Sequence, residues 1–153
     1  AFLSSKEEET PNGAILEGMH FLCAEDNELN AEILTELLKM KGAECTICEN
    51  GQKVVETFEQ SVPGAYDMIL MDVQMPVMNG YDAARAIRRS LHKQAGTIPI
   101  IAMTANAFSE DIRHSLTAGM NAHISKPVDM MLLEKTIRSI KSGGGSETQA
   151  DKE

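Results

Sequence analysis

Short apolar runs alternate with longer stretches of mixed polarity along most of the chain. Continuous apolar runs bounded by turn residues are typical of strands that are buried on both faces of a sheet. Runs of this kind predict strands over residues 18–24, 43–48, 68–71, 98–103 and 122–125. Each is followed by a stretch whose apolar residues recur at helical spacing. The pattern predicts five strands alternating with five helices, an α/β fold in which a parallel sheet carries helices on both faces.

Each helical stretch has one apolar side, which we expect to face the sheet. The ends of these helices are indicated by Gly42, Pro63-Gly64 and Gly119. From the first helix to the last, the residues predicted to point inward are Leu29, Ile33, Leu34, Leu37 and Leu38; Val54, Val55 and Phe58; Ala83, Ala84, Ile87 and Leu91; Phe108, Ile112, Ser115 and Leu116; and Leu133, Ile137 and Ile140.

The two ends of the chain differ in composition from its middle. Residues 1–17 are rich in Lys and Glu and contain a Pro-Asn-Gly turn, so we expect them to bury little and to form a linker or tail. Residues 142–153 are rich in Gly and polar residues and are predicted to be a flexible tail, too short for an output domain. A single domain is therefore predicted over residues 18–141.

Composition excludes some classes of function. The formal net charge of -9 argues against direct binding of nucleic acid, which requires a basic surface. No apolar run approaches the roughly 20 residues that span a bilayer, and no signal peptide is evident, so we expect a cytoplasmic domain without direct membrane contact. Its parent protein can still be attached to a membrane. Cys45 and Cys48 have the spacing of a redox or metal pair, but on a strand they point to opposite faces. We therefore expect free thiols in a reducing compartment.

Polar side chains follow four of the predicted strands. Glu25 and Asp26 follow the first strand, Asp72 the third, Thr104 the fourth and Lys126 the fifth. Because parallel strands end at the same edge of a sheet, we expect these side chains to meet there. Three carboxylates at one place repel each other, and a hard divalent cation such as Mg²⁺ would relieve that repulsion. A carboxylate nucleophile, a metal, a lysine and a hydroxyl donor are the groups that phosphoryl transfer to Asp72 requires.

Taken singly, each of these residues has a purely structural interpretation. Glu25 and Asp26 are typical of the acidic first turn of a helix. Thr104 can satisfy a backbone group at the end of a strand, and Lys126 can be a solvated lysine before a turn proline. Their occurrence at four strand ends in the same chain favours a common site.

Four segments resemble receiver (response regulator) domains of two-component phosphorelays: CAEDN, MILMDVQMPVMNG, IIAMTA and HISKP. The resemblance covers roughly Gly18 to Lys141, and the style of the motifs is most similar to the receivers of hybrid sensor histidine kinases. It implies a (βα)5 flavodoxin-like three-layer sandwich with a sheet of order 2-1-3-4-5. It also implies a histidine kinase or a histidine phosphotransfer domain as the partner, and a monomer or weak dimer. By itself such a domain would catalyse only its own phosphorylation and dephosphorylation.

The resemblance also implies a set of metal ligands. Asp26 would bind Mg²⁺ directly and Glu25, which replaces the commoner Asp, through water. Asp72 and the backbone carbonyl of Gln74 would complete the protein ligands.

The same resemblance assigns the residues that handle the phosphoryl group. Asp72 would accept it from a phosphohistidine, Lys126 would pair with it, and Thr104 would move toward it and so switch the surface around the fourth helix, fifth strand and fifth helix. A cis Lys126-Pro127 bond is expected. The chain departs from many relatives at His123, where they carry Tyr or Phe.

Three alternative functions have other requirements. An interaction module that kept the fold without the chemistry would not need the intact Asp72 and Lys126. A flavin-binding electron carrier needs a phosphate loop after the first strand, where the acidic residues 25–28 would repel a phosphate. A phosphatase acting through an aspartyl-phosphate usually has a second aspartate two residues after the first, where this chain has Gln74.

Overall fold

Five strands form one sheet of order β2-β1-β3-β4-β5, and every neighbouring pair is parallel. The computed structural model describes residues 15–75, 77–105, 113 and 115–141. The strands are β1 (His20–Ala24), β2 (Glu44–Cys48), β3 (Met68–Asp72), β4 (Ile100–Thr104) and β5 (Ala122–Ser125). The predicted strand order and direction are confirmed.

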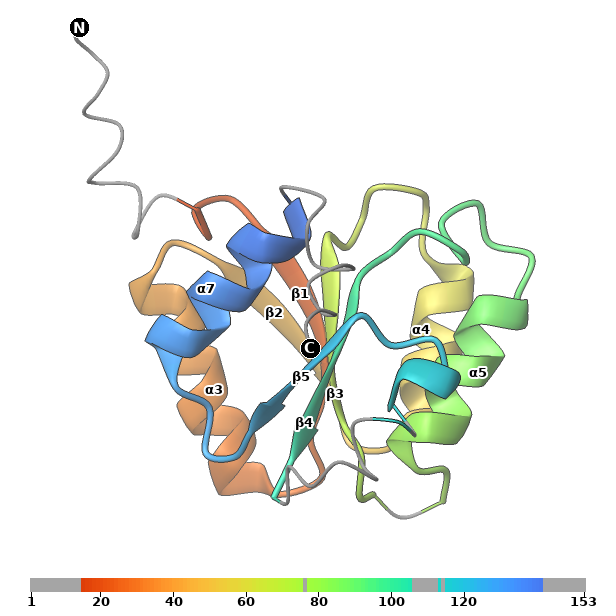
Figure 1. Ribbon diagram of the computed structural model, residues 1–153, viewed down its shortest axis with the longest axis horizontal. Coiled ribbons are helices and arrows are strands. Elements are labelled where there is room, and N and C mark those ends of the chain that lie inside the picture. Colours follow the sequence, from red (N-terminus) through yellow and green to blue (C-terminus); the bar gives the residue numbers. More distant parts are fainter. Residues whose placement is uncertain (1–14, 76, 106–112, 114, 142–153) are drawn as a thin grey trace, which may run out of the picture.

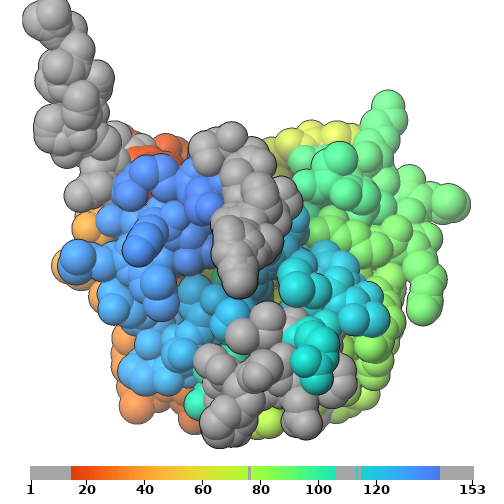
Figure 2. All heavy atoms as spheres, in the orientation of Figure 1, coloured from red at the N-terminus to blue at the C-terminus, as the bar shows by residue number. Residues whose placement is uncertain are grey.

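Helices cover both faces of the sheet and make a three-layer sandwich (Figure 1). On one face lie α3 (Glu28–Met40) and α7 (Met130–Lys141), and on the other lie α4 (Gly51–Gln60) and α5 (Gly80–Arg89). In Figure 2 the blue residues of α7 lie between orange residues of α3 and the green part of the chain that contains α5. Residues 115–117, between β4 and β5, are also helical.

An asparagine begins each of the three helices that follow the first three strands. The side chains of Asn27, Asn50 and Asn79 each accept a hydrogen bond from the backbone N–H three residues later. A side-chain acceptor at this position satisfies one of the N–H groups that a helix leaves unpaired. These caps fix the point at which the chain leaves the sheet edge and enters each helix.

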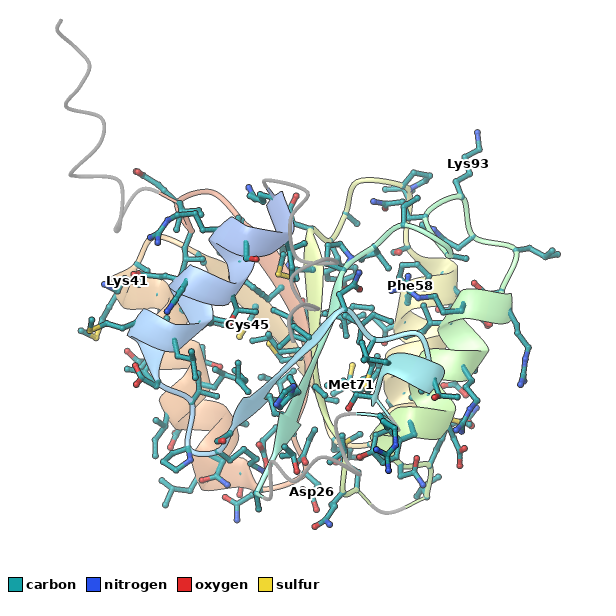
Figure 3. All side chains as sticks on the ribbon, in the orientation of Figure 1. Asp26, Lys41, Cys45, Phe58, Met71 and Lys93 are labelled. Atoms are coloured by element: carbon teal, nitrogen blue, oxygen red, sulfur yellow. The ribbon has the colours of Figure 1, made fainter. Side chains whose placement is uncertain are left out.

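The sheet separates two apolar clusters. Ile69 and Met71 of β3 contribute to the cluster beneath α4 and α5, whereas Met68 and Leu70 contribute to the cluster beneath α3 and α7. Figure 3 shows Met71 and Phe58 on the same side of the molecule as α4 and α5. Because successive strand residues point to opposite faces, β3 is buried on both, as its continuous apolar run predicts.

The orientation of α3 differs from the prediction. Leu34 and Leu38 are buried as expected, but Leu29 is 63% and Ile33 49% exposed. Ala31 takes a place in the buried stripe. The inner face of the helix is therefore rotated toward Ala31, and the predicted inward placement of Leu29 and Ile33 is wrong.

Most of the other predicted inward residues are buried or packed against the core. Leu91 is fully exposed because α5 ends at Arg89, two residues earlier. Leu116 is 58% exposed, although Ser115 beside it is buried. Phe108 and Ile112 lie outside the described residues. The residues confirmed as buried are Val54, Val55, Phe58, Ala83, Ala84, Ile87, Leu133 and Ile137.

The segment before β1 contributes to the core. Leu16 is 0% exposed and belongs to the cluster beneath α3 and α7, so the expectation that residues 1–17 bury little is wrong at this position. Residues 1–14 and 142–153 lie outside the described residues, and their assignment as a linker and a tail stays a prediction.

The three cysteines are free thiols, as predicted. Cys45 packs against the cluster beneath α3 and α7, and Cys48 belongs to the opposite cluster, so β2 directs them to different faces. Among the described residues, no helix is both long enough and apolar enough to cross a bilayer.

Candidate functional site

The register of the sheet brings the predicted site residues to one edge. Asp72 is the last residue of β3 and pairs with Met103, next to Thr104 on β4. Thr104 pairs with Ser125, and the backbone N–H of Lys126 donates to the Thr104 carbonyl at 2.8 Å. Asp26 lies at this edge, which is the lower one in Figure 3, far from Lys93 at the upper edge. The expectation that these strand ends converge is confirmed.

Three carboxylates form a compact acidic cluster. One oxygen each from Glu25, Asp26 and Asp72 lies within 4.8 Å of the other two. Glu25 and Asp72 are 4% and 2% exposed, whereas Asp26 is exposed. Glu25 is held in place because its Oε2 accepts a hydrogen bond from the backbone N–H of Asn27 at 3.2 Å. Clustered carboxylate oxygens are the ligands that Mg²⁺ and Ca²⁺ prefer, so these residues fit a hard divalent cation.

Lys126 supplies a positive charge beside this cluster. Its Nζ lies 2.9 Å from Asp72 Oδ2 and 3.3 Å from Glu25 Oε1. Burial acts to lower the pKa of Lys126, but the hydrogen bond and charge of Asp72, together with Glu25, outweigh it and raise the pKa. The ammonium therefore stays charged at neutral pH. The Lys126-Pro127 bond is cis, as predicted.

The two oxygens of Asp72 have different surroundings. Oδ2 accepts from Lys126, and Oδ1 accepts from the backbone N–H of Gln74 at 3.1 Å. These bonds orient a carboxylate that is almost wholly buried at the end of β3. A buried acid that is oriented in this way, with a fixed cation beside it, has the arrangement required of a phosphoryl acceptor.

Counted together, the charges at the site do not balance. Three carboxylates face one ammonium, so ionised acids leave two negative charges uncompensated, three minus one. A bound divalent cation would cancel that excess. The cluster opens into a hollow of about 710 Å³, whose lining includes Glu25, Asp26 and Lys53.

Gly80 supports the site in a way that the sequence did not indicate. A Cβ added at Gly80 would lie 2.4 Å from the backbone oxygen of Asp72 and 2.8 Å from Val73 Cα. The start of α5 therefore packs directly against the end of β3, and glycine permits this approach. The pair Asn79-Gly80 indicates a turn in the sequence, but nothing in it shows how near the turn comes to Asp72.

The fold and the site together define a doubly wound α/β domain with a buried aspartate, an acidic cluster that fits a divalent cation and a lysine at one sheet edge. The family model of the response regulator receiver domain matches residues 21–138. The chain belongs to this family, and it is a receiver domain of two-component phosphorelay systems.

Relatives and solved structures agree with this assignment. The chain is 34% identical over 148 residues to probable histidine kinase 2 of Oryza sativa, a match that covers 90% of this chain and 14% of that protein. It resembles the receiver domain of the histidine kinase CKI1 from Arabidopsis thaliana complexed with Mg²⁺ and BeF3⁻, with a TM-score of 0.74, 31% identity and coverage of 86% of this chain and 95% of that one.

A third likeness is to a receiver domain in a complex. The receiver domain of Ssk1 from Saccharomyces cerevisiae was crystallised with the histidine phosphotransfer protein Ypd1. That comparison has a TM-score of 0.70 and 32% identity, and covers 79% of this chain and 87% of the other.

Proposed function

We propose that the chain accepts a phosphoryl group from a phosphohistidine onto Asp72, with Mg²⁺ bound at the acidic cluster. The observation that carries this proposal is the convergence of Lys126 and the carboxylates of Glu25 and Asp26 on a single buried Asp72 carboxylate. Each of these groups lies at the end of a strand or just after it, at the same sheet edge, where open α/β sheets bind their ligands.

The transfer would form one bond and break one. A carboxylate oxygen of Asp72 attacks phosphorus, a P–O bond forms, and the P–N bond to the donor imidazole breaks in line with it. The imidazole leaves with the electron pair of the P–N bond. Lys126, which already contacts Asp72 at 2.9 Å, neutralises charge on the phosphoryl oxygens. Such catalysis depends mainly on positioning and charge stabilisation.

The metal would be held by Asp26, Glu25, Asp72 and the backbone carbonyl of Gln74. When bound there, Mg²⁺ would supply positive charge to offset the negative charge of the phosphoryl oxygens. The all-oxygen donor set and the excess negative charge of the cluster support this ion over softer metals.

Thr104 would respond to phosphorylation. It is 4% exposed at the end of β4, on the strand next to Asp72. Its hydroxyl can donate to a phosphoryl oxygen on Asp72, and this contact would favour one arrangement of the surface formed by the helix after β4, by β5 and by α7. His123 lies on β5 within that surface.

The donor would be a histidine kinase or a histidine phosphotransfer domain. The Ssk1–Ypd1 complex supports this choice, because the receiver in it is similar to this chain. The chain spans 14% of the length of the rice kinase that it matches. We therefore propose that the parent protein is a hybrid histidine kinase, in which the receiver relays the phosphoryl group.

The test is phosphorylation by a small donor. The chain is incubated with Mg²⁺ and acetyl phosphate, and intact mass spectrometry detects an acid-stable, base-labile adduct of one phosphoryl group. Asp72→Asn is expected to abolish the adduct. Asp82→Asn, which changes an exposed carboxylate in the first turn of α5, is the matched control and is expected to be labelled normally. An adduct that persists in Asp72→Asn would place the acceptor elsewhere.

A further inference from the structure

Residues 15–19, the entry segment, lie immediately before β1 and are packed onto the domain. They precede the stretch that matches the receiver family, which begins at residue 21. Leu16 is nevertheless 0% exposed, and Ile15 packs against the same apolar cluster. The entry segment is therefore a structured addition to the family pattern in this chain.

Backbone contacts hold the entry segment against the turn between α3 and β2. The Gly18 N–H donates to the Gly42 carbonyl at 2.9 Å, and the Met19 N–H donates to the Leu16 carbonyl at 3.0 Å. A Cβ built at Gly42 would lie 3.1 Å from Glu17 Cγ, so the two pieces of chain pass close to each other. Gly42 also has a φ of 84°, which glycine adopts without strain. These contacts give the entry segment one defined course.

The side chain of Leu16 packs in the cluster that α7 covers. That cluster contains Leu38 of α3 together with Leu133 and Ile137 of α7, all of them fully buried. In Figure 2 the red residues at the start of the described chain border blue residues of α7. A close-packed interior loses contacts when one of its elements shifts, so the buried Leu16 favours the present placement of α7.

An ion pair links α7 to the same turn. Glu134 of α7 is 4% exposed, and its Oε2 lies 3.2 Å from Nζ of Lys41, the neighbour of Gly42. Separating the partners of a buried ion pair leaves an uncompensated charge, so this pair also resists a shift of α7. The entry segment and α7 are thus held against one turn, between α3 and β2.

We propose that the entry segment is a regulatory contact. Leu16 stabilises the present placement of α7, and phosphorylation of Asp72 weakens this contact, so that the state of Asp72 is passed to the chain that precedes residue 15. This inference rests on the proposed function, because it assumes that phosphorylation rearranges the surface to which α7 belongs. Such coupling is reciprocal, so a force that pulls the entry segment away favours the phosphorylated arrangement.

Amide hydrogen exchange of the wild-type chain is the first test. Mg²⁺ and beryllium fluoride are added as a stable substitute for the phosphoryl group, and exchange is followed by NMR. The Gly18 and Met19 amides should exchange about fivefold faster or more, because their hydrogen bonds belong to the contact that weakens. The Ser61 N–H, which donates to the Phe58 carbonyl at the end of α4, is the control and should keep its rate.

A truncation of Leu16 is the second test. Mg²⁺ and beryllium fluoride should raise the melting temperature of Leu16→Ala by about 2–4 °C more than that of the wild type, since the contact that opposes the rearrangement is gone. Val54→Ala is the matched control, because it truncates a fully buried residue in the cluster on the other face of the sheet, and it should show the wild-type rise. A purely structural Leu16 would lower the melting temperature equally with and without the additives.

The outcomes separate this inference from the proposed function. In a chain that acetyl phosphate labels at Asp72, unchanged exchange at Gly18 and Met19 would overturn the inference alone. An equal rise in melting temperature for Leu16→Ala and the wild type would also overturn it. If Leu16→Ala did not fold, the exchange measurement on the wild type would decide the question. A wild-type chain that acetyl phosphate does not label would overturn the proposed function itself.

Discussion

At the scale of single residues, the site depends on the groups that contact the side chain and the backbone of Asp72. The carboxylate receives one hydrogen bond from Lys126 and one from the Gln74 N–H, so both of its oxygens are oriented. Behind it, the backbone oxygen of the same residue lies only 2.4 Å from the position that a Cβ on Gly80 would take. Asp72 is thus positioned from its side chain and from its backbone.

We expect Gly80→Ala to move the end of β3. The new Cβ cannot stay 2.4 Å from the Asp72 oxygen, so strand and helix must separate. Overpacking of this kind lowers the free energy of unfolding by about 1–3 kcal/mol. Labelling by acetyl phosphate should slow as well, since Asp72 is displaced from Lys126. Urea unfolding and intact mass measure the two effects.

Gly96→Ala is the matched control for this change, because nothing lies within 4 Å of a Cβ built at Gly96. Its stability should stay within about 0.5 kcal/mol of the wild type. Equal effects of the two substitutions would mean that the contact between Gly80 and Asp72 has no energetic importance.

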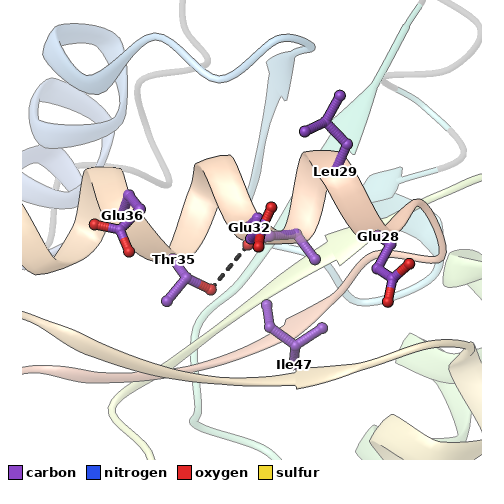
Figure 4. Close-up of a pocket in the computed structure, with 7 residues that line it drawn as sticks. Glu28, Leu29, Glu32, Thr35, Glu36 and Ile47 are labelled. Carbon is purple, nitrogen blue, oxygen red and sulfur yellow. Dashed lines mark hydrogen bonds between the residues drawn. The ribbon is translucent and has the colours of Figure 1, made fainter.

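At the scale of elements, α3 has a buried side that faces the sheet and an exposed side that also carries large apolar residues. Ala31, Leu34 and Leu38 face the sheet, whereas Leu29 and Ile33 are exposed on a second side. Glutamates, together with Leu29 and Ala31, line a groove of about 630 Å³ between α3 and the edge strand β2, where Ile47 faces the helix (Figure 4). These glutamates recur every four residues, at Glu28, Glu32 and Glu36.

Because α3 buries Leu34 but exposes Leu29, truncating these two leucines should change the free energy of unfolding by different amounts. Leu34→Ala should lower the free energy of unfolding by about 2–5 kcal/mol, because it opens a cavity at a residue that is 4% exposed. Leu29→Ala should change it by less than about 0.5 kcal/mol, since Leu29 is 63% exposed. Urea denaturation with a common m-value measures both. Similar losses for the two variants would contradict the orientation of the helix.

At the scale of the whole molecule, the two helices on one face of the sheet, α3 and α7, are linked although they lie far apart in the sequence. Glu134 of α7, 4% exposed, forms an ion pair at 3.2 Å with Lys41, the capping residue that follows α3. The site edge is formed in the same way, by segments that lie far apart in the chain. Stability and cation binding are therefore expected to be coupled, because the acidic cluster exists only in the folded chain.

Mg²⁺ should raise the melting temperature of the wild-type chain. A ligand that binds only the folded state adds about 2.7 kcal/mol at a hundred times its Kd. Asp26→Asn should remove most of this gain. In EDTA the same variant should be as stable as the wild type or more so, because one of three repelling carboxylates is gone. Thermal unfolding measures whether Asp26→Asn is less stable than the wild type in Mg²⁺ but equally or more stable in EDTA.

Asp82→Asn changes an exposed carboxylate that pairs with Arg85 and does not belong to the cluster, so it should keep the wild-type response to Mg²⁺. If Asp26→Asn responded to Mg²⁺ as strongly as Asp82→Asn, the ion would be bound somewhere else.

The sequence by itself determined the order of strands and helices, and it identified the residues that meet at the sheet edge. Apolar runs and helical spacing are local signals, and parallel strands must end at a common edge. The placement of Asp72 and Lys126, which are separated by 54 residues, at one edge therefore followed from strand direction. The four segments CAEDN, MILMDVQMPVMNG, IIAMTA and HISKP indicated the family.

Only the tertiary structure decided how deeply each residue lies and how closely segments approach. It rotated α3 away from the face that Leu29 and Ile33 predict, placed Leu16 in the core and brought Gly80 against Asp72. Burial and close contact depend on neighbours supplied by distant parts of the chain, and a local pattern contains no information about them.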